Sequence, residues 1–278
     1  MLTLKSLHQT RLGFAFAAGL AAAMTSGSAY AQSTDGAVRT IHIATAAESR
    51  PLSWGALGVE PQGYEPDVLK AINAKLPQYK FEMEGAADIA QETGLVTGKY
   101  DMVTGGYYKS DARAEQFYIP TTPLGVSTMR IYSLKGSGIN EMKDLVGKRI
   151  VPVTAGGGVF RFVTKWQEEN PDFVLDVATS SAGIPFPNRM QEVNNGKSDA
   201  LILPSNLGQK EVIENQKLDL VASEPVASNN TYILIGKSEE NAVLLADVDR
   251  VLAELKADGT LDQISQKWFG EDVARYMK

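Results

Sequence analysis

The sequence predicts an α/β protein, and two observations carry that prediction. Short segments with strand-like patterns alternate with segments whose apolar residues recur at helical spacing, and such alternation is typical of α/β units with largely parallel sheets. An N-terminal leader of 31 residues leaves 247 residues, a length that can bury a large core and suits two lobes. The sequence contains no internal repeat and no low-complexity tract.

The leader has the three parts of a secretory signal peptide. Lys5 and Arg11 supply a positive region, residues 12–24 form an apolar run of 13 residues, and residues 29–31 (A-Y-A) form a small-x-small cleavage site. A membrane-spanning helix needs about 20 apolar residues, so a retained anchor is disfavoured. No cysteine follows the run. We therefore expect a signal peptide over residues 1–31 and a mature chain that begins at Gln32, without a lipid anchor, in a Gram-negative periplasm.

The first elements follow in chain order. Thr40–Thr45 alternates around two isoleucines and predicts a strand, and Pro66–Leu76 predicts a helix that Pro77 ends. Ile89–Gly98 predicts a short helix. Asp101–Gly106 predicts a buried strand that runs into a glycine turn, and Gly125–Leu134 a longer extended segment.

The second half continues the alternation. Lys143–Lys148 leads into a predicted strand at Arg149–Val153, and a loop of three glycines at 156–158 precedes a predicted helix at Val159–Glu168. Ala200–Leu203 predicts a strand and Asn230–Gly236 an extended segment.

The C-terminal segment predicts two packed helices. Apolar residues recur at helical spacing from Leu244 to Leu255, and Asp258-Gly259 ends this helix because glycine adopts the left-handed conformation without steric cost. Thr260 followed by Gln263 is a capping-box pattern that begins a second helix, whose apolar stripe is residues 261, 264 and 268.

Composition excludes several kinds of site. The mature chain carries 25 basic and 33 acidic residues, a formal charge of −8 without a basic run, which disfavours nucleic acid and anionic membrane surfaces. There is no cysteine, and His42 is the one histidine after the leader. Thiolate sites, multi-histidine metal sites and disulfides are therefore excluded, and a Ser-His-Asp triad would have to use His42, which we expect to be an ordinary strand residue. We expect no cofactor.

Several short segments resemble, in order and spacing, the family 3 extracellular solute-binding proteins that serve amino-acid ABC importers. GYEPDVL at 63–69 is similar to the family's G-F-x-x-D-L, and LVTGKYDMVTGG at 95–106 to its L-x-x-G-x-x-D-hydrophobic stretch. SDAR at 110–113 is similar to T-x-x-R, KDLVGK at 143–148 to DLKGK, and NGKSDA at 195–200 to G-x-x-D-A. The last segments that resemble the family are ADGT at 257–260 and KWFG at 267–270.

The resemblance implies a two-lobe periplasmic-binding-protein fold, with a ligand cleft between lobes joined by two crossing strands. Residues 38–125 and 229–278 would form lobe 1, and residues 126–228 lobe 2. The implied function is non-enzymatic: the protein, expected to be a monomer, would bind a small polar, carboxylate-bearing solute, an amino acid or a similar compound. It would deliver this solute to an inner-membrane ABC permease, which recognises the closed form.

The resemblance also implies ligand contacts in lobe 1. The arginine of T-x-x-R takes the ligand's α-carboxylate in the family, which assigns Arg113 that role, since a guanidinium binds a carboxylate through two parallel bonds. A surface pair with Asp111 or Glu115 is the alternative. Gly105 and Gly106 would let the backbone approach the ligand. Tyr108, where the family has a small hydroxyl residue, would stack on the ligand or pack at the lobe edge.

In lobe 2, the glycines stand where the family has G-[ST]-T. Backbone amides of Gly157 and Gly158 at a helix N-terminus would bind the other side of the carboxylate, and no Gly-Lys-Ser/Thr follows that would make a P-loop. Pro204 replaces the family's ammonium-binding aspartate and is followed by Ser205, a further candidate. Without this aspartate the ligand need not be a plain α-amino acid, and a carboxylate, a dicarboxylate or a modified amino acid are alternatives.

The first-strand loop departs from the family too. Ser49 and Leu52 replace aromatic residues, while Arg50 adds a candidate cation. Asp88 and Glu48 are candidate acids, each with a solvated surface charge as the alternative.

Two other functions remain open at the level of sequence. A periplasmic enzyme on the same fold, similar to a dehydratase, would need an acid or base, and Glu48, Asp88 and Lys109 are the candidates. A ligand sensor or accessory binding protein would use the same cleft.

Overall fold

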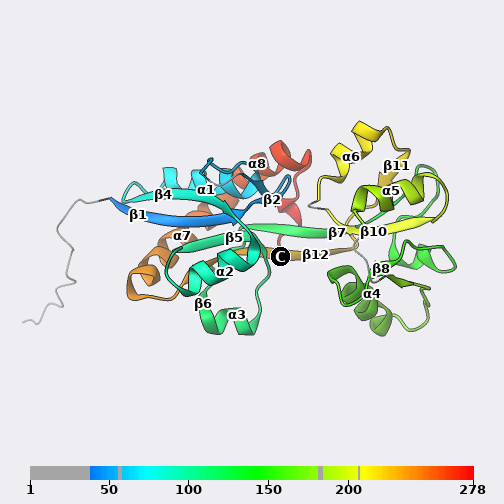
Figure 1. Ribbon diagram of the computed structural model, residues 1–278, viewed down its shortest axis with the longest axis horizontal. Helices are drawn as coiled ribbons and strands as arrows, with labels where there is room; N and C mark the ends of the chain where they lie inside the picture. The colour runs from blue at the N-terminus through cyan, green and yellow to red at the C-terminus, as the bar shows by residue number, and fades with distance from the viewer. Residues whose placement is uncertain (1–37, 56–57, 181–183, 206) are drawn as a thin grey trace, which may run out of the picture. The chain divides into compact units, whose positions relative to one another are not determined.

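A computed structural model describes residues 38–55, 58–180, 184–205 and 207–278. The predicted signal peptide lies outside these residues. The described chain forms two α/β lobes on one mixed, eight-stranded sheet with the path β10-β7-β12-β5-β1-β4, while β11 pairs with β7 and β6 with β12 (Figure 1).

The first lobe contains both ends of the described chain. Its elements are β1 (Arg39–Ala46), β2 (Glu48–Ser49), β3 (Ser53–Trp54), α1 (Tyr64–Ala74), β4 (Tyr79–Ala86), α2 (Asp88–Val96), β5 (Met102–Tyr107), α3 (Asp111–Gln116), β6 (Phe117–Tyr118), α7 (Glu239–Ala257), α8 (Thr260–Phe269) and the 3₁₀ turn η2 (Ala274–Tyr276).

The second lobe is built from the middle of the sequence. Its elements are the 3₁₀ turn η1 (Met142–Leu145), β8 (Val153–Thr154), α4 (Gly158–Glu169), β9 (Thr179–Ser180), α5 (Phe186–Asn194), β10 (Ala200–Pro204), α6 (Gln209–Gln216) and β11 (Leu220–Ala222). Two long strands pair with each other between the lobes: β7 (Gly125–Leu134) also pairs with β10 and β11 of the second lobe, and β12 (Ala227–Gly236) with β5 and β6 of the first.

The parallel part of the sheet is in the first lobe. β1 pairs in parallel with β4 along its whole length and with β5 at Ile43 and Ala44. The predicted strand at Thr40–Thr45 is confirmed. The short β8–β9 pair is parallel as well. The prediction of largely parallel sheets is wrong for the rest of the large sheet, because β12 is antiparallel to both β5 and β7, and β10 is antiparallel to β7.

Helices α1, α7 and α8 share one buried core with β1 and β12. Val68, Leu69 and Ile72 of α1 are fully buried in it, which confirms the predicted helix and its face. The two predicted C-terminal helices are also confirmed, and Gly259 between them has a φ of +79°. The capping box is wrong, because the Thr260 amide and hydroxyl both donate to Asp258 Oδ1, at 3.0 and 2.6 Å.

One strand predicted in the second lobe is wrong. Arg149–Val153 does not form a continuous strand: Ile150 makes a single parallel bridge to Ala200, and β8 begins only at Val153. Pro152 separates the two. Because proline has no amide hydrogen to donate, it interrupts the ladder at that position.

β7 and β12 are the two strands that cross between the lobes. Residues 125–129 of β7 pair with β12, and residues 129–134 pair with β10 and β11. The lobe boundaries at residues 125–126 and 228–229 stay a prediction.

The C-terminal residues add a further connection between the two lobes. Both carboxylate oxygens of Glu271, which follows α8, accept from Arg130 Nη2 on β7 at 2.9 Å, and Arg130 Nη1 donates to the Ser223 carbonyl at 2.7 Å. The Arg130 side chain is only 8% exposed and that of Glu271 is 35% exposed, so a buried cation is neutralised by a partly exposed carboxylate.

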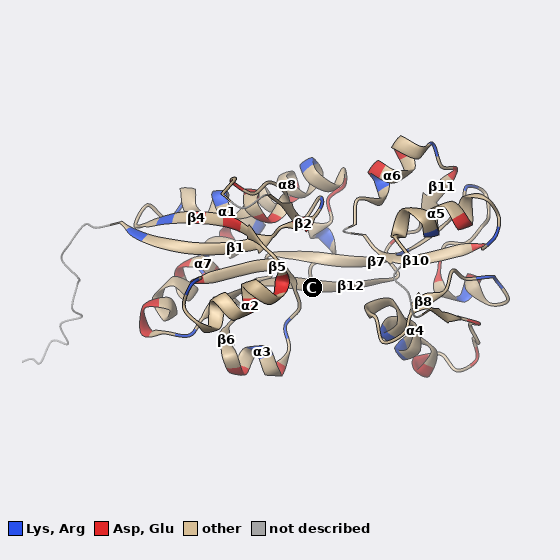
Figure 2. Cartoon of the chain, viewed as in Figure 1, with Lys and Arg blue, Asp and Glu red and all other residues tan. Residues whose placement is uncertain are grey.

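Charges of both signs are distributed over the helices of both lobes (Figure 2). Over the part of the chain that the structure describes, every helix is too short or too polar to cross a membrane.

Candidate ligand-binding cleft

The first-lobe edge of the cleft is formed where parallel strands end. β1 ends at Ala46 and β4 at Ala86, which are partners in the parallel register, and β5 ends at Tyr107 beside them. Carboxyl ends of parallel strands are where open α/β sheets bind ligands. The residues that follow each strand therefore lie at a common edge.

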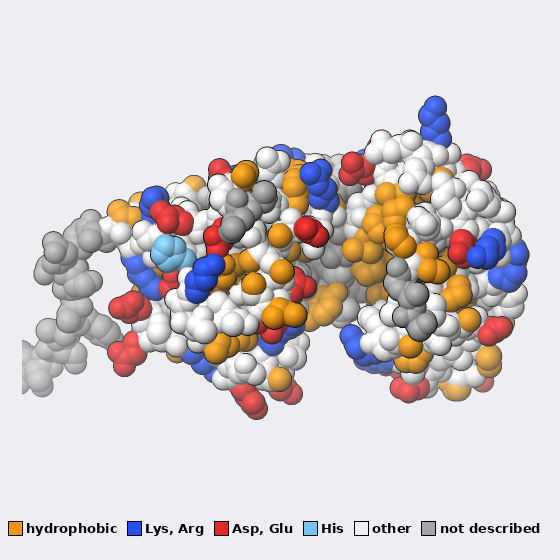
Figure 3. Space-filling model, in the orientation of Figure 1, with side chains coloured by type: hydrophobic (Ala, Val, Ile, Leu, Met, Phe, Trp, Pro, Cys, Tyr) orange, Lys and Arg blue, Asp and Glu red, His pale blue; other side chains and the backbone are white. Residues whose placement is uncertain are grey.

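A groove at this edge is lined by residues of both lobes. The first lobe contributes the β1–β3 segment and the end of β4, and the second lobe contributes Phe186 at the start of α5 and Leu207 after β10. The groove has a volume of about 810 Å³. Hydrophobic side chains gather beside the hollow over β10, α5 and α6 (Figure 3). Trp54 and Phe186 are the two aromatic side chains of this groove, and neither was a candidate from the sequence.

Arg50 is the predicted site cation that lines the groove, together with Glu48 and Ser49. Its guanidinium carbon lies 4.6 Å from the centroid of the Trp54 ring, a cation–π contact. Trp54 in turn packs edge-on against Trp268 at 5.2 Å. The aromatic residue expected in this loop is therefore present at position 54 rather than at 49 or 52, and it orients Arg50.

Arg113 lies on the short helix α3 and has three partners. Its Nη1 donates to the Tyr108 carbonyl at 2.9 Å, its Nη2 contacts Glu92 Oε1 at 3.1 Å, and the guanidinium stacks on Tyr107 at 4.8 Å. The partner acid is thus Glu92 of α2, not Asp111 or Glu115. Tyr108 itself is 44% exposed.

Gly105 and Gly106 lie on β5, and Gly106 has a φ of +71° that favours glycine. The Gly106 amide donates to Glu65 Oε1 at 3.0 Å. Glu65 is fully buried, and its Oε2 has no partner within the described part of the chain. Burial raises the pKa of Glu65 to about 7, although the bond from the Gly106 amide opposes that rise. Glu65 was not a candidate from the sequence.

Among the described residues, the predicted acids at the first-lobe edge have no basic partner. Asp88 is the first residue of α2, beside the groove residues Ala86 and Ala87, and it is exposed, as is Glu48. Neither carboxylate has an ammonium or guanidinium nitrogen within 4.0 Å among the described residues. Lys109, the third candidate for an enzyme, is also exposed.

In the second lobe, Gly157 caps α4 and Gly158 is its first residue. The Gly157 amide donates to the Thr154 carbonyl at 3.0 Å. A Cβ at Gly158 would meet no atom within 4 Å, so the start of this helix is open.

Two arginines approach this turn from different helices. Arg161 Nη1 donates to the Gly156 carbonyl at 2.6 Å, and Arg189 Nη2 donates to Thr154 Oγ1 at 3.3 Å. Neither was a candidate in the sequence analysis, because the two arginines are 28 positions apart and no local motif connects them.

Pro204 ends β10 and Ser205 follows it, and polar atoms of both residues are hydrogen-bonded to neighbours. The Pro204 carbonyl accepts a short hydrogen bond from the Gln209 side chain. Ser205 Oγ lies 2.5 Å from Thr128 Oγ1, and the Ser205 amide donates to the Thr128 carbonyl at 2.7 Å. The Pro204 carbonyl, at the position of the family's aspartate, is therefore already engaged by Gln209.

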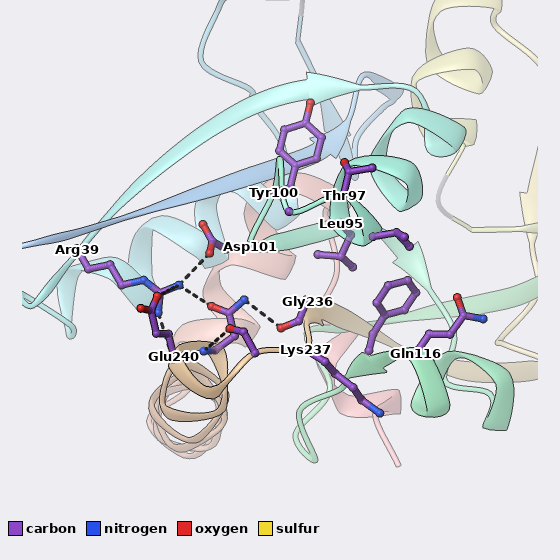
Figure 4. A pocket seen from close by; sticks show the side chains of 14 residues that line it. Arg39, Leu95, Thr97, Tyr100, Asp101, Gln116, Gly236, Lys237 and Glu240 are labelled. Atoms are coloured by element: carbon purple, nitrogen blue, oxygen red, sulfur yellow. Dashed lines mark hydrogen bonds and ion pairs between the residues drawn. The ribbon is translucent and has the colours of Figure 1, made fainter.

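A second pocket of about 500 Å³ lies in the first lobe between α2, β6, β12 and the start of α7 (Figure 4). Its charged groups contact one another: Arg39 Nη2 lies 2.9 Å from Asp101 Oδ1 and 2.6 Å from Asn241 Oδ1, and Nη1 donates to the Glu240 carbonyl. These bonds connect β1 and the start of β5 with α7, so the charged residues of this second pocket have a structural role.

The described residues contain no group of three or more metal-ligating side chains that could hold an ion. His42 lies on β1 with its side chain 56% exposed, and its Nδ1 is 3.9 Å from Glu82 Oε2.

A family model for bacterial extracellular solute-binding proteins, family 3, matches residues 41–271. The putative amino-acid ABC transporter-binding protein PatH of Vibrio harveyi is 31% identical over 217 residues, which cover 77% of this chain and 82% of PatH. The L-cystine-binding protein TcyJ of Bacillus subtilis is 25% identical over 246 residues, or 87% of this chain and 88% of TcyJ.

The fold has solved counterparts. The structure of the probable amino-acid ABC transporter extracellular-binding protein ytmK from Bacillus subtilis matches with a TM-score of 0.70 at 24% identity, covering 84% of this chain and 99% of ytmK. The L-cystine solute receptor of Neisseria gonorrhoeae, solved unliganded and open, matches with a TM-score of 0.68 at 19% identity, covering 85% and 95% of the two chains. Together with the family match, this likeness extends over both lobes.

Proposed function

We propose that this chain, which belongs to the bacterial extracellular solute-binding proteins of family 3, is the periplasmic substrate-binding component of an ABC importer. Its ligand is a small polar solute with a carboxylate, an amino acid or a similar compound. The observation that carries the proposal is the groove to which both lobes contribute, at the carboxyl ends of β1 and β4. A ligand there contacts both lobes, and its binding energy favours the closed form.

The proposed contacts follow the sequence candidates, with additions from the structure. Arg113 takes the ligand's α-carboxylate, for which it exchanges its exposed partner Glu92. The amide of Gly158, and that of Gly157 once it exchanges the Thr154 carbonyl, assist from the second lobe at the start of α4. Arg50, Tyr108, Gly105, Gly106, Ser205 and Asp88 complete the proposed cleft, and Trp54 and Phe186 supply its apolar walls.

The partner of the closed form is an inner-membrane ABC permease. The relatives named above are binding proteins of amino acids and cystine, which supports transport rather than catalysis. We place the protein in the periplasm as a monomer after removal of residues 1–31, with lobe boundaries near residues 125 and 229.

A thermal-shift and calorimetry screen of the purified protein tests this proposal. A true ligand at about 100 times its dissociation constant should add roughly 2.7 kcal/mol of stability, and deletion of the gene should abolish uptake of that compound. The ligand should be recovered chemically unchanged. Failure of every amino acid and organic acid to bind would refute the proposal, and conversion of a bound acid would favour the enzyme with Glu48, Asp88 or Lys109 instead.

A further inference from the structure

Gln91 of α2 is a fully buried polar side chain behind the first-lobe edge of the cleft. Its Nε2 donates to the Ala86 carbonyl at 2.9 Å, and its Oε1 accepts from the Tyr107 hydroxyl at 3.0 Å. Burial of a primary amide is unfavourable unless its donors and its acceptor find partners. The two bonds therefore fix Gln91 in one position and connect the residues that it contacts.

The two partners of Gln91 are the last residues of two strands. Ala86 ends β4 and lines the groove, and Tyr107 ends β5. Because β1 lies between these strands in the sheet, Gln91 connects two strand ends that are not adjacent. A Cβ at Gly105 would lie 3.4 Å from Gln91 Oε1, so the backbone of β5 packs directly against the amide.

Tyr107 is the residue through which Gln91 acts on Arg113. The Arg113 guanidinium carbon lies 4.8 Å from the centroid of the buried Tyr107 ring, a cation–π contact. The bond to Gln91 holds the hydroxyl end of this ring, so the ring presents a fixed face to the guanidinium. Burial raises the pKa of Tyr107 well above its usual value, so the hydroxyl keeps the proton that it donates to Gln91.

The contact between Arg113 and the Tyr107 ring matters most when a ligand is bound. In the unliganded protein the guanidinium also contacts Glu92 at 3.1 Å and the Tyr108 carbonyl at 2.9 Å. The proposed exchange of Glu92 for a ligand carboxylate leaves the carbonyl and the ring to orient the guanidinium. An arginine binds a carboxylate through two parallel bonds only when the planes of the two groups are aligned, so a ring that is not fixed would weaken this binding.

A second buried side chain holds the neighbouring residue of β5. The Gly106 amide donates to Glu65 Oε1 of α1 at 3.0 Å. The two helices pack in different cores, since α1 shares one with α7 and α8, whereas Leu95 of α2 shares another with Tyr107. The backbone at the end of β5 is thus held independently of Gln91, whose own contribution is the orientation of the Tyr107 ring.

We propose that Gln91 is a positioning residue for ligand recognition: its bond to the Tyr107 hydroxyl fixes the ring that orients the Arg113 guanidinium for the ligand's carboxylate. The contact between Arg113 and a carboxylate rests on the proposed function. The orientation of the guanidinium, in contrast, is a property of the unliganded protein and can be measured without a ligand.

Nuclear magnetic resonance of the arginine side chains tests the inference in the unliganded protein. The Nε–Hε signal of Arg113, assigned by its loss in Arg113→Lys, should show an upfield ring-current shift from Tyr107. Tyr107→Leu removes the ring and gives the unshifted position. Gln91→Leu and Tyr107→Phe each remove the same hydrogen bond but keep the ring, and each should move the signal most of the way to that position. The double variant should move it no further, because both substitutions act through one bond.

Asn241→Leu is the matched control. Asn241 is a buried amide of the same lobe whose Nδ2 donates to the Gly236 carbonyl and whose Oδ1 accepts from Arg39, in the second pocket. This substitution should lower the urea midpoint about as much as Gln91→Leu does, since each leaves buried polar groups unpaired, but it should leave the Arg113 signal unchanged. A wild-type signal without a ring-current shift, a signal that stays in place in Gln91→Leu, or one that also moves in Asn241→Leu overturns the inference.

Calorimetry with L-cystine as the probe then tests recognition, because the relative TcyJ is an L-cystine-binding protein. Gln91→Leu should weaken binding roughly 3- to 10-fold in the wild-type background but less than about twofold in the Arg113→Ala background, since its effect passes through that arginine. An equal loss in both backgrounds, or no loss in either, overturns the inference. A wild-type protein that does not bind L-cystine counts against this compound as the ligand of the proposed function, and the Arg113 signal alone then decides the role of Gln91.

Discussion

Arg113 provides the sharpest test of the cleft, because the structure gives it a competitor. Its pair with Glu92 spans 3.1 Å, with side chains 31% and 46% exposed. Exposed pairs of this kind contribute about 0–1 kcal/mol. A ligand carboxylate in a closed, desolvated cleft is a stronger partner, and removal of the arginine should cost about 2–5 kcal/mol of binding free energy. The ligand can therefore displace Glu92.

Two substitutions should move affinity in opposite directions. Arg113→Ala should weaken binding by about 30-fold or more, and Arg113→Lys should also bind poorly, since an ammonium lacks the planar fork. Glu92→Gln should strengthen binding, by no more than about fivefold, because it removes a competitor worth at most about 1 kcal/mol.

The assay is isothermal titration calorimetry with the best ligand from the screen, alongside urea denaturation of each variant. Stability should change by less than about 1 kcal/mol, since the pair is exposed. Unchanged affinity in both Arg113 variants would remove this residue from the site. Weaker binding in Glu92→Gln would show that Glu92 positions Arg113 rather than competing for it.

Three further predictions concern the scaffold and export. Glu271→Ala should lower the free energy of unfolding in urea by roughly 1–3 kcal/mol, because it leaves the buried Arg130 without its partly exposed carboxylate; an unchanged free energy would contradict a stabilising role for this pair. Glu65, whose pKa rises from 4.5 to about 7 on folding, keeps a proton in the native state that the unfolded chain releases. Stability should therefore fall as pH rises from about 4.5 to 7, by up to about 3 kcal/mol, and Glu65→Gln should flatten this slope in urea titrations. Intact-mass measurement of periplasmic extract should show a chain that begins at Gln32, whereas an uncleaved, membrane-bound form would refute the predicted signal peptide.

Local patterns predicted most of the scaffold. The helical spacing at Val68, Leu69 and Ile72 gave α1 and its buried face, because one stripe of a helix must be apolar to pack on a sheet. β4 was missed although its pattern is visible: Lys80 and Glu82 are exposed and alternate with the half-buried Phe81. Its many charges hide a strand whose outer face is solvated.

The site was less predictable because its geometry depends on contacts between distant segments. Arg113 was found through a motif, but its partner Glu92 is 21 positions away on another helix. Arg161 and Arg189 meet at one turn only after α4 and α5 have packed. A sequence pattern over a few residues contains no information about such pairs.

A buried arginine of the scaffold has a carboxylate partner, whereas an arginine at the groove has none in the described part of the chain. Arg130 is buried, and it is neutralised by Glu271 from the far end of the sequence, because a buried cation without a counter-ion would cost several kcal/mol. Arg50 has no carboxylate within 4.0 Å among the described residues; it lines the groove, and its guanidinium lies against Trp54. In the proposed function the counter-charge of this arginine comes from the ligand, so binding should require a solute with an anionic group, because a guanidinium that is desolvated without a counter-ion is costly.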